Sequence, residues 1–227
     1  MLKLPKLYAI VDRETLDKLG VSVRAFAEEL HEGGVRLVQY RDKKNGPQEV
    51  LRAAAEIAAV FEGIEATLIL NDRADLAVLA GWGVHVGQGD LSPDEARAVV
   101  CCRKRYPTLR DEAARGWGTR ICGVVGVSTH NDAQVIAADA GAADYVAVGP
   151  VFATSTKVDA EPVVGLEGVR RARALTRKPL VAIGGITREN ARSVIDAGAD
   201  SVVVIGGLLV MGMPVGEVAR EFLKILQ

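Results

Sequence analysis

The sequence predicts an α/β fold, a single (β/α)8 barrel of the TIM type that takes in residues 1–227. Eight short apolar runs rich in β-branched residues alternate along the chain with eight segments of helical periodicity. The runs are apolar almost throughout, as a parallel sheet buried on both faces requires. An open doubly wound sheet would alternate in the same way and is the competing interpretation. The barrel is favoured because no dinucleotide-binding GxGxxG follows the first run.

Each predicted unit consists of one strand and the helix that follows it. The predicted strands are Leu7–Val11, Arg36–Tyr40, Thr67–Leu70, Gly83–Val86, Ile121–Val127, Tyr145–Val148, Leu180–Ile183 and Ser201–Ile205. The predicted helices are Val23–His31, Pro47–Phe61, Asp72–Leu79, Pro93–Cys102, Asn131–Ala140, Leu166–Leu175, Arg188–Ala197 and Pro214–Leu226. Helix boundaries carry the usual signals: Ser92 offers a capping hydroxyl before Pro93, and Gly198 follows the end of a helix.

One connection, at about residues 101–120, does not fit the regular alternation. It carries six Lys and Arg residues against two acidic residues, together with Pro107, Gly116 and Gly118. We expect an extended surface connection here. A basic patch for a binding partner is the alternative.

Composition excludes several classes of protein. The chain is 49% hydrophobic and 25% charged, and its formal net charge of −1 predicts binding to neither nucleic acid nor an anionic membrane. The longest uncharged stretch, Ser201–Gly216, holds four glycines and Pro214, and is too short and too broken to span a bilayer. The amino terminus has no signal-peptide pattern, and three cysteines form neither a CxxC pair nor an even set. We therefore expect a cytoplasmic protein.

The stretch from Val35 to Lys44 places polar side chains at the end of a buried strand. Gln39, Arg41 and Lys43 alternate onto the face that Val35 and Leu37 occupy, which should be the buried one. A buried charge without a partner is very costly, so we expect an anion there. Two cations and an amide suit a di- or triphosphate. Solvated charges at a strand end are the alternative interpretation.

Two acidic residues follow the next two strands. Barrel enzymes gather their chemistry at the carboxyl ends of the strands, where Asn71, Asp72 and Asp90 fall. Mg²⁺ binds through one or two carboxylates together with phosphate oxygens of a substrate. Asp72 and Asp90 therefore predict a magnesium and pyrophosphate site beside Arg41 and Lys43. Each aspartate could instead be a simple helix N-cap.

The last three strands end in glycines and hydroxyl-bearing residues. Glycine pairs at 184–185 and 206–207 would let a phosphate approach backbone N–H groups closely, although two tight turns would also explain them. The segment after the sixth strand adds further donors: Thr154, Ser155, Thr156 and Lys157. His85 is expected to be a packed or positioning residue. No pattern predicts a covalent nucleophile or a zinc site.

The motifs QYRDK, LND, GVHVGQGD, GVSTH, GPVFATSTK, AIGGI and VIGG, in this order, resemble the thiamine phosphate synthase family. The resemblance extends from Leu7 to about Leu209. It implies a transferase that moves the hydroxymethylpyrimidine group from its pyrophosphate to thiazole phosphate, by a dissociative route with Mg²⁺ as cofactor. The implied binders of the pyrimidine pyrophosphate are Gln39, Arg41, Lys43, Asn71, Ser128 and Lys157. Asp72 and Asp90 would hold Mg²⁺. The implied binders of thiazole phosphate are Thr154, Ser155, Thr156, Gly185, Ile205 and Gly206.

Among these residues, the resemblance gives catalytic roles to Arg41, Lys43, Ser128 and Lys157. The partners it implies are the two small-molecule substrates, and the sequence indicates no oligomeric state. Three departures concern the loops: Gly206 stands where the family usually has serine, Ala153 where it often has proline, and the 101–120 connection is longer.

Two other functions compete with the synthase. One is a thiazole tautomerase on a similar barrel, and the other is a non-catalytic sensor of a phosphate ligand. The basic and acidic set around Arg41 and Asp72 favours the synthase, because a tautomerase has no use for a second, metal-bound anion.

Overall fold

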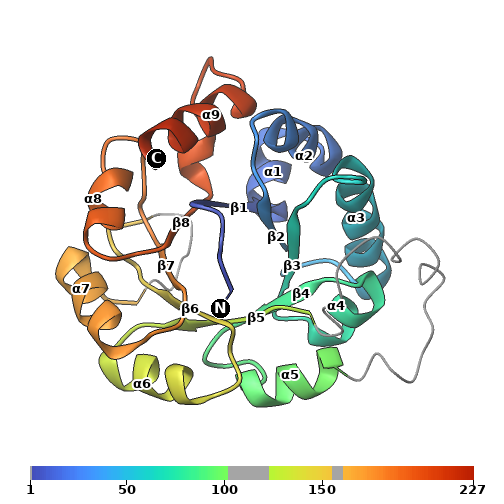
Figure 1. Cartoon of the computed structure of the whole chain (residues 1–227). Helices are drawn as coiled ribbons and strands as arrows, with labels where there is room; N and C mark the ends of the chain where they lie inside the picture. The colour runs from blue at the N-terminus through green and yellow to red at the C-terminus, as the bar shows by residue number, and fades with distance from the viewer. Residues whose placement is uncertain (1, 102–122, 155–160) are drawn as a thin grey trace.

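The computed structural model describes residues 2–101, 123–154 and 161–227. Eight parallel strands close into a barrel in the order of the sequence, β1 to β8, and β8 pairs with β1 through the register Leu7 to Val202. Figure 1 looks along this barrel and shows the helices as an outer ring around the strands. The predicted (β/α)8 fold is therefore confirmed, and the open sheet is excluded.

The strands match the predicted runs closely. They are β1 (Leu7–Asp12), β2 (Leu37–Arg41), β3 (Thr67–Asn71), β4 (Gly83–Val86), β5 (Val125–Thr129), β6 (Tyr145–Val148), β7 (Leu180–Ile183) and β8 (Ser201–Val204). The largest shift is in β5, which begins later than predicted and continues through Ser128. Val35 precedes β2 and packs with the outer core, so it does not share the face of Leu37.

The helices include two elements that the sequence did not predict. The α-helices are α1 (Arg13–Leu19), α2 (Val23–Glu32), α3 (Pro47–Val60), α4 (Ala74–Ala80), α5 (Pro93–Cys101), α6 (Asp132–Ala140), α7 (Gly165–Leu175), α8 (Ala191–Asp196) and α9 (Val215–Ile225), and η3 (Gly206–Leu208) is a short 3-10 helix. The unpredicted elements are α1 and η3. The expected extended connection at 101–120 lies outside the described residues, apart from Cys101.

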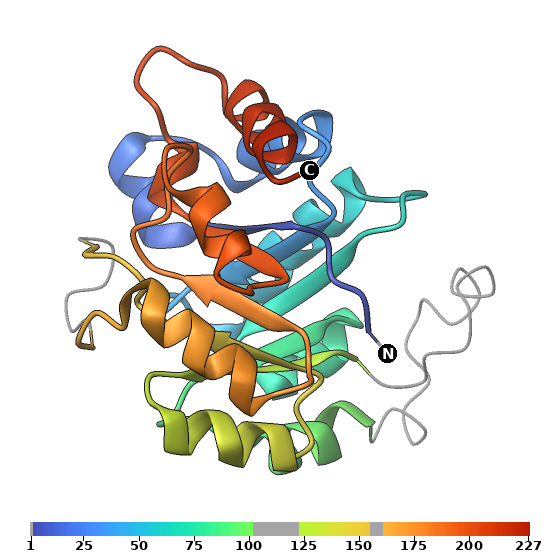
Figure 2. The same cartoon turned by 60° about the vertical axis from the view of Figure 1, so that its left-hand side comes forward.

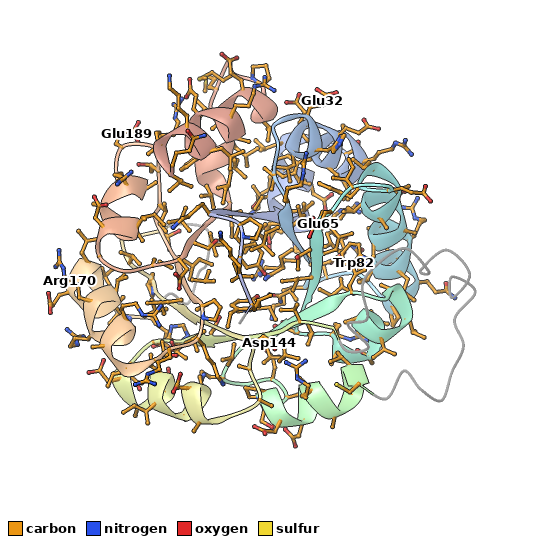
Figure 3. The ribbon with its side chains drawn as sticks, viewed as in Figure 1. Glu32, Glu65, Trp82, Asp144, Arg170 and Glu189 are labelled. Atoms are coloured by element: carbon orange, nitrogen blue, oxygen red, sulfur yellow. The ribbon has the colours of Figure 1, made fainter. Side chains whose placement is uncertain are left out.

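Two apolar clusters divide the core. The larger one joins residues of the strands to residues of the helices, which Figure 2 shows packed outside the barrel. The smaller one fills the inside of the barrel with Tyr8, Ile10, Leu37, Ile69, Tyr145, Ala147, Val181 and Val203. Side chains crowd the inside of the ring in Figure 3, whereas the labelled Arg170 and Glu189 point outward. Leu4, from the segment that crosses the ring ahead of β1, also packs in the inner cluster. The barrel is thus filled from its amino-terminal side, which leaves its carboxyl-terminal side for a pocket.

Candidate active site

A pocket of about 690 Å³ opens at the carboxyl ends of the strands, and all eight strands contribute to its wall. Every predicted site residue that the structure describes lines it: Gln39, Arg41, Lys43, Asn71, Asp72, Asp90, Ser128, Thr154, Gly185, Ile205 and Gly206. Ser155, Thr156 and Lys157 lie outside the described residues. Residues up to 167 positions apart in the sequence, from Gln39 to Gly206, therefore meet at one mouth of the barrel.

Arg41 is held by an acidic residue that the sequence reasoning missed. Its guanidinium donates to Asp12 Oδ1 at 2.5 Å, and Asp12 is only 4% exposed. The other carboxylate oxygen of Asp12 accepts from the backbone N–H and the hydroxyl of Thr15, so Asp12 also caps α1. Part of the anionic charge expected at this strand end is therefore supplied by the protein itself, and the di- or triphosphate stays a prediction. Asp12 is itself the last residue of β1, and that position was the available signal.

Lys43, Asp72 and Asp90 form a charged group at the rim of β2 to β4. Lys43 Nζ donates to Asp72 Oδ2, and Lys43 is half exposed. Burial raises the pKa of Asp72. Lys43 opposes this rise, and the neighbouring Asp90 carboxyl adds to it. Asp90 Oδ2 also accepts from the backbone N–H of Gly87 at 2.9 Å. Two carboxylates that repel each other this closely are a suitable pair of oxygen ligands for a divalent cation.

Neither aspartate is a helix cap, so both capping alternatives are wrong. Arg73 occupies the N-cap position of α4, and Ser92 forms a capping box with Glu95 ahead of α5. Among the described residues Asp72 alone has a positive φ without being glycine, at 61°. Its backbone N–H donates to the carbonyl of His85 at 2.7 Å. A residue other than glycine that is held at a positive φ is commonly found at a functional site.

Below the rim, five polar side chains form a continuous chain of hydrogen bonds across the inside of the barrel. In order along the chain they are Gln39, Tyr8, Tyr145, His85 and Ser128. Burial lowers the pKa of His85 to about 4, so its imidazole is neutral at physiological pH. Burial likewise raises the pKa of both tyrosines, which keeps their hydroxyls protonated.

His85 is thus packed and hydrogen-bonded, as expected. Tyr8 and Tyr145 were missed. Their strands lie 137 positions apart in the sequence, and only the closed barrel brings their hydroxyls to 3.0 Å.

The side of the pocket formed by β6 to β8 offers mainly backbone and neutral side chains, and Glu161 is the charged residue described on it. Gly184 and Gly185 have φ values of 103° and 63°, and a Cβ on Gly185 would come within 2.5 Å of the Ala153 carbonyl oxygen. Both glycines are therefore required by conformation and by close approach. Within the described part of the chain, the backbone N–H groups of Gly185 and Gly206 donate to no protein acceptor. This side can offer neutral donors to an anion.

Comparison with known proteins identifies the family. The sequence model of the family described as thiamine monophosphate synthase matches residues 7–104 and 118–208. A thiamine-phosphate synthase from Koribacter versatilis is 51% identical over 228 residues, which cover 99% of this chain and 97% of that protein. The chain belongs to the thiamine monophosphate synthase family. The resemblance stated from the motifs is thereby confirmed, and so is the expectation that the chain is an enzyme, a transferase.

More distant relatives agree with this membership. A thiamine-phosphate synthase from Methanospirillum hungatei is 35% identical, with 97% of each chain covered. Among solved structures, thiamine phosphate pyrophosphorylase from Pyrococcus furiosus superposes with a TM-score of 0.77 at 27% identity, covering 97% of this chain and 95% of that one. Other barrels below 25% identity, such as a 3-hexulose-6-phosphate synthase at 19%, are alike in fold alone.

Two remaining expectations concern a membrane-spanning segment and a metal site. In the described residues no helix is long and apolar enough to cross a membrane. No group of three or more His, Cys, Asp or Glu side chains in those residues is arranged to enclose a metal ion. Asp72 and Asp90 would therefore need water or substrate oxygens to complete the coordination of a cation.

Proposed function

We propose that this chain transfers the hydroxymethylpyrimidine group from its pyrophosphate to thiazole phosphate, with Mg²⁺ as cofactor, to give thiamine phosphate and pyrophosphate. The observation that carries the proposal is the convergence of Arg41, Lys43, Asp72 and Asp90 at one rim of a pocket whose opposite wall is rich in glycine and neutral residues. Such a pocket suits two anionic substrates that are bound by different means.

The charged rim fits the departing pyrophosphate. The bond between the pyrimidine methylene carbon and the pyrophosphate oxygen breaks first, and negative charge accumulates on the leaving group. Mg²⁺ held by Asp72 and Asp90 would neutralise part of that charge. Lys43, now paired with Asp72, would be free to turn toward the pyrophosphate beside Arg41 once Asp72 held the cation. Each charge-assisted hydrogen bond contributes about 1.5–3 kcal/mol, and about 1.4 kcal/mol gained only in the transition state accelerates a reaction tenfold.

The backbone wall fits the acceptor. The thiazole phosphate needs to be held in place but develops no new charge, so the N–H groups of Gly185 and Gly206 are suitable donors. Thr154 lines the same wall. The thiazole nitrogen then attacks the pyrimidine methylene cation with its lone pair, and this step requires neither a base nor a protein nucleophile. The lack of a suitable nucleophile and base pair among the sequence motifs agrees with that chemistry. We place the reaction in the cytoplasm, in keeping with the soluble substrates.

The test is the Lys43→Ala variant, assayed for coupling of the two substrates with Mg²⁺. We expect turnover to fall by about tenfold to a hundredfold, with the circular dichroism spectrum unchanged. Lys44→Ala is the matched control, because Lys44 lies in the same loop, pairs with Glu14 and does not line the pocket. Normal coupling by Lys43→Ala would contradict the proposed role. Rearrangement of the thiazole substrate alone would support the tautomerase, and tight binding without turnover would support the sensor.

A further inference from the structure

The hydrogen-bonded chain below the pocket has a direction that can be worked out from its atoms. Gln39 Nε2 donates to the Tyr8 hydroxyl at 2.6 Å. The Tyr8 and Tyr145 hydroxyls are 3.0 Å apart, and Tyr145 lies 2.8 Å from His85 Nδ1. His85 Nε2 lies 2.9 Å from Ser128 Oγ. All of these side chains except Tyr145 line the pocket. Ser128 is partly exposed, and the other four residues are 8% exposed or less.

Each hydroxyl has one hydrogen to donate, and the amide donor at Gln39 sets the order. Since Tyr8 already accepts from Gln39, its own hydrogen goes to Tyr145. The hydrogen of Tyr145 then goes to His85 Nδ1. In the opposite direction Tyr8 would accept twice and bury its hydrogen without a partner, and an unpaired buried donor is costly.

The direction decides what the chain presents at each end. A neutral imidazole that accepts at Nδ1 carries its hydrogen on Nε2, so His85 donates to Ser128 Oγ. Ser128 therefore has its own hydrogen left for the pocket. At the other end, Gln39 Oε1 accepts from no described residue and is 2% exposed, so it is left as an acceptor.

We propose that Tyr8, Tyr145 and His85 are positioning residues that make Ser128 a hydrogen-bond donor and Gln39 a hydrogen-bond acceptor toward the ligand. A matching ligand presents an unprotonated ring nitrogen to Ser128 and an exocyclic N–H to Gln39. An aminopyrimidine has both groups, whereas a thiazole has no amino group. The proposal depends on the proposed function only for the identity of the ligand. The direction of the hydrogen bonds is a property of the ligand-free protein.

The direction is tested by ¹⁵N NMR of the ligand-free protein with labelled histidine, at a pH where the side chains are neutral. We expect His85 to carry its hydrogen on Nε2. His130 serves as an internal reference with its hydrogen on Nδ1, because Nδ1 lies 2.6 Å from the Gly149 carbonyl oxygen, which can only accept. The protein has three histidines, so the His31→Gln and His130→Gln variants assign the NMR signals. A hydrogen on Nδ1 of His85 would overturn the proposal.

The consequence for binding is tested with Tyr145→Phe, which keeps the ring that stacks on His85 but removes the hydroxyl. Nδ1 of His85 then lacks the hydroxyl that fixes the hydrogen on Nε2, so Ser128 is no longer held as a donor toward the ligand. We expect the KM for the pyrimidine pyrophosphate to rise about tenfold to a hundredfold, while the KM for thiazole phosphate stays the same. Tyr8→Phe should have a smaller effect, because Tyr145 still donates to His85.

The control is Thr129→Val, which removes another buried hydroxyl of β5, one that bonds the Ala147 carbonyl outside the chain of hydrogen bonds. We expect it to lower stability without moving either KM. An equal rise of both KM values in Tyr145→Phe, or no rise, would overturn the positioning role. The NMR experiment needs no turnover, so an inactive wild-type enzyme would contradict the proposed function and leave the direction of the chain to be judged on its own.

Discussion

The two sides of the pocket offer an anion different kinds of partner. The side formed by β2 to β4 gathers charged groups, namely Arg41, Lys43, Asp72 and Asp90, each with a partner already in place. The side formed by β6 to β8 offers the backbone N–H groups of Gly185 and Gly206, and the positive φ of Gly184 and Gly185 requires glycine at those two positions. In the proposed reaction, the charged side would stabilise the group that gains charge, whereas the backbone side would hold the group whose charge is constant.

The largest expected effect comes from Asp72→Asn on the charged side. The variant keeps the size of the side chain but removes the negative charge of one of the two proposed cation ligands, so we expect turnover with Mg²⁺ to fall by a hundredfold or more, on the order of 3 kcal/mol. Initial rates of pyrophosphate release measure the change. Asp75→Asn is the control, because Asp75 lies on α4 nearby but pairs with Arg73 at the surface. Equal rates in both variants would show that Asp72 is not a ligand that matters.

A smaller effect, on the KM for one substrate, is expected from Gly185→Ala on the backbone side. The added Cβ would meet the Ala153 carbonyl oxygen and Phe152, so the wall must shift. We expect the KM for thiazole phosphate to rise about tenfold, the equivalent of one lost hydrogen bond, with the pyrimidine KM unchanged. Gly63→Ala is the control, since Gly63 has a similar φ of 77° but open space around it. A rise in the pyrimidine KM instead would mean that the two sides are not separate.

The smallest effect concerns stability and its dependence on pH. The pKa of Asp72 is raised in the folded state, so the folded protein binds the proton more tightly than the unfolded chain. Asp72 therefore costs stability once the pH is above its folded-state pKa, and the cost disappears as the pH falls below its ordinary value. Without divalent cations, we expect Asp72→Asn to be more stable than wild type at pH 7 and equal to it near pH 3. Urea denaturation across this range measures the difference. If the wild type were more stable than Asp72→Asn at pH 7, the predicted sign of the stability difference would be wrong.

The fold and the pocket wall could be predicted from the sequence for a physical reason. Parallel strands buried on both faces leave apolar runs, and their ends collect at one mouth, so residues such as Asn71 and Ser128 could be placed from chain position alone. Asp12 was missed because the short helix α1 that it caps was not predicted. The positive φ of Asp72 could not be read from residue type, and it decides that Asp72 faces the pocket rather than capping α4.

The hydrogen-bonded chain inside the barrel was beyond sequence reasoning. Tyr8, His85 and Tyr145 come from strands that are far apart in the sequence, and their contacts depend on the diameter of the closed barrel. Apolar periodicity places such side chains inside but does not say which of them meet.

The most direct test of the account is a crystal structure of this protein with Mg²⁺ and pyrophosphate. We expect the metal ion between Asp72 and Asp90, with the pyrophosphate on Arg41 and Lys43 and the β6 to β8 side left for the second substrate. Pyrophosphate bound at Gly185 and Gly206, or a metal ion that avoids both aspartates, would contradict the central claim.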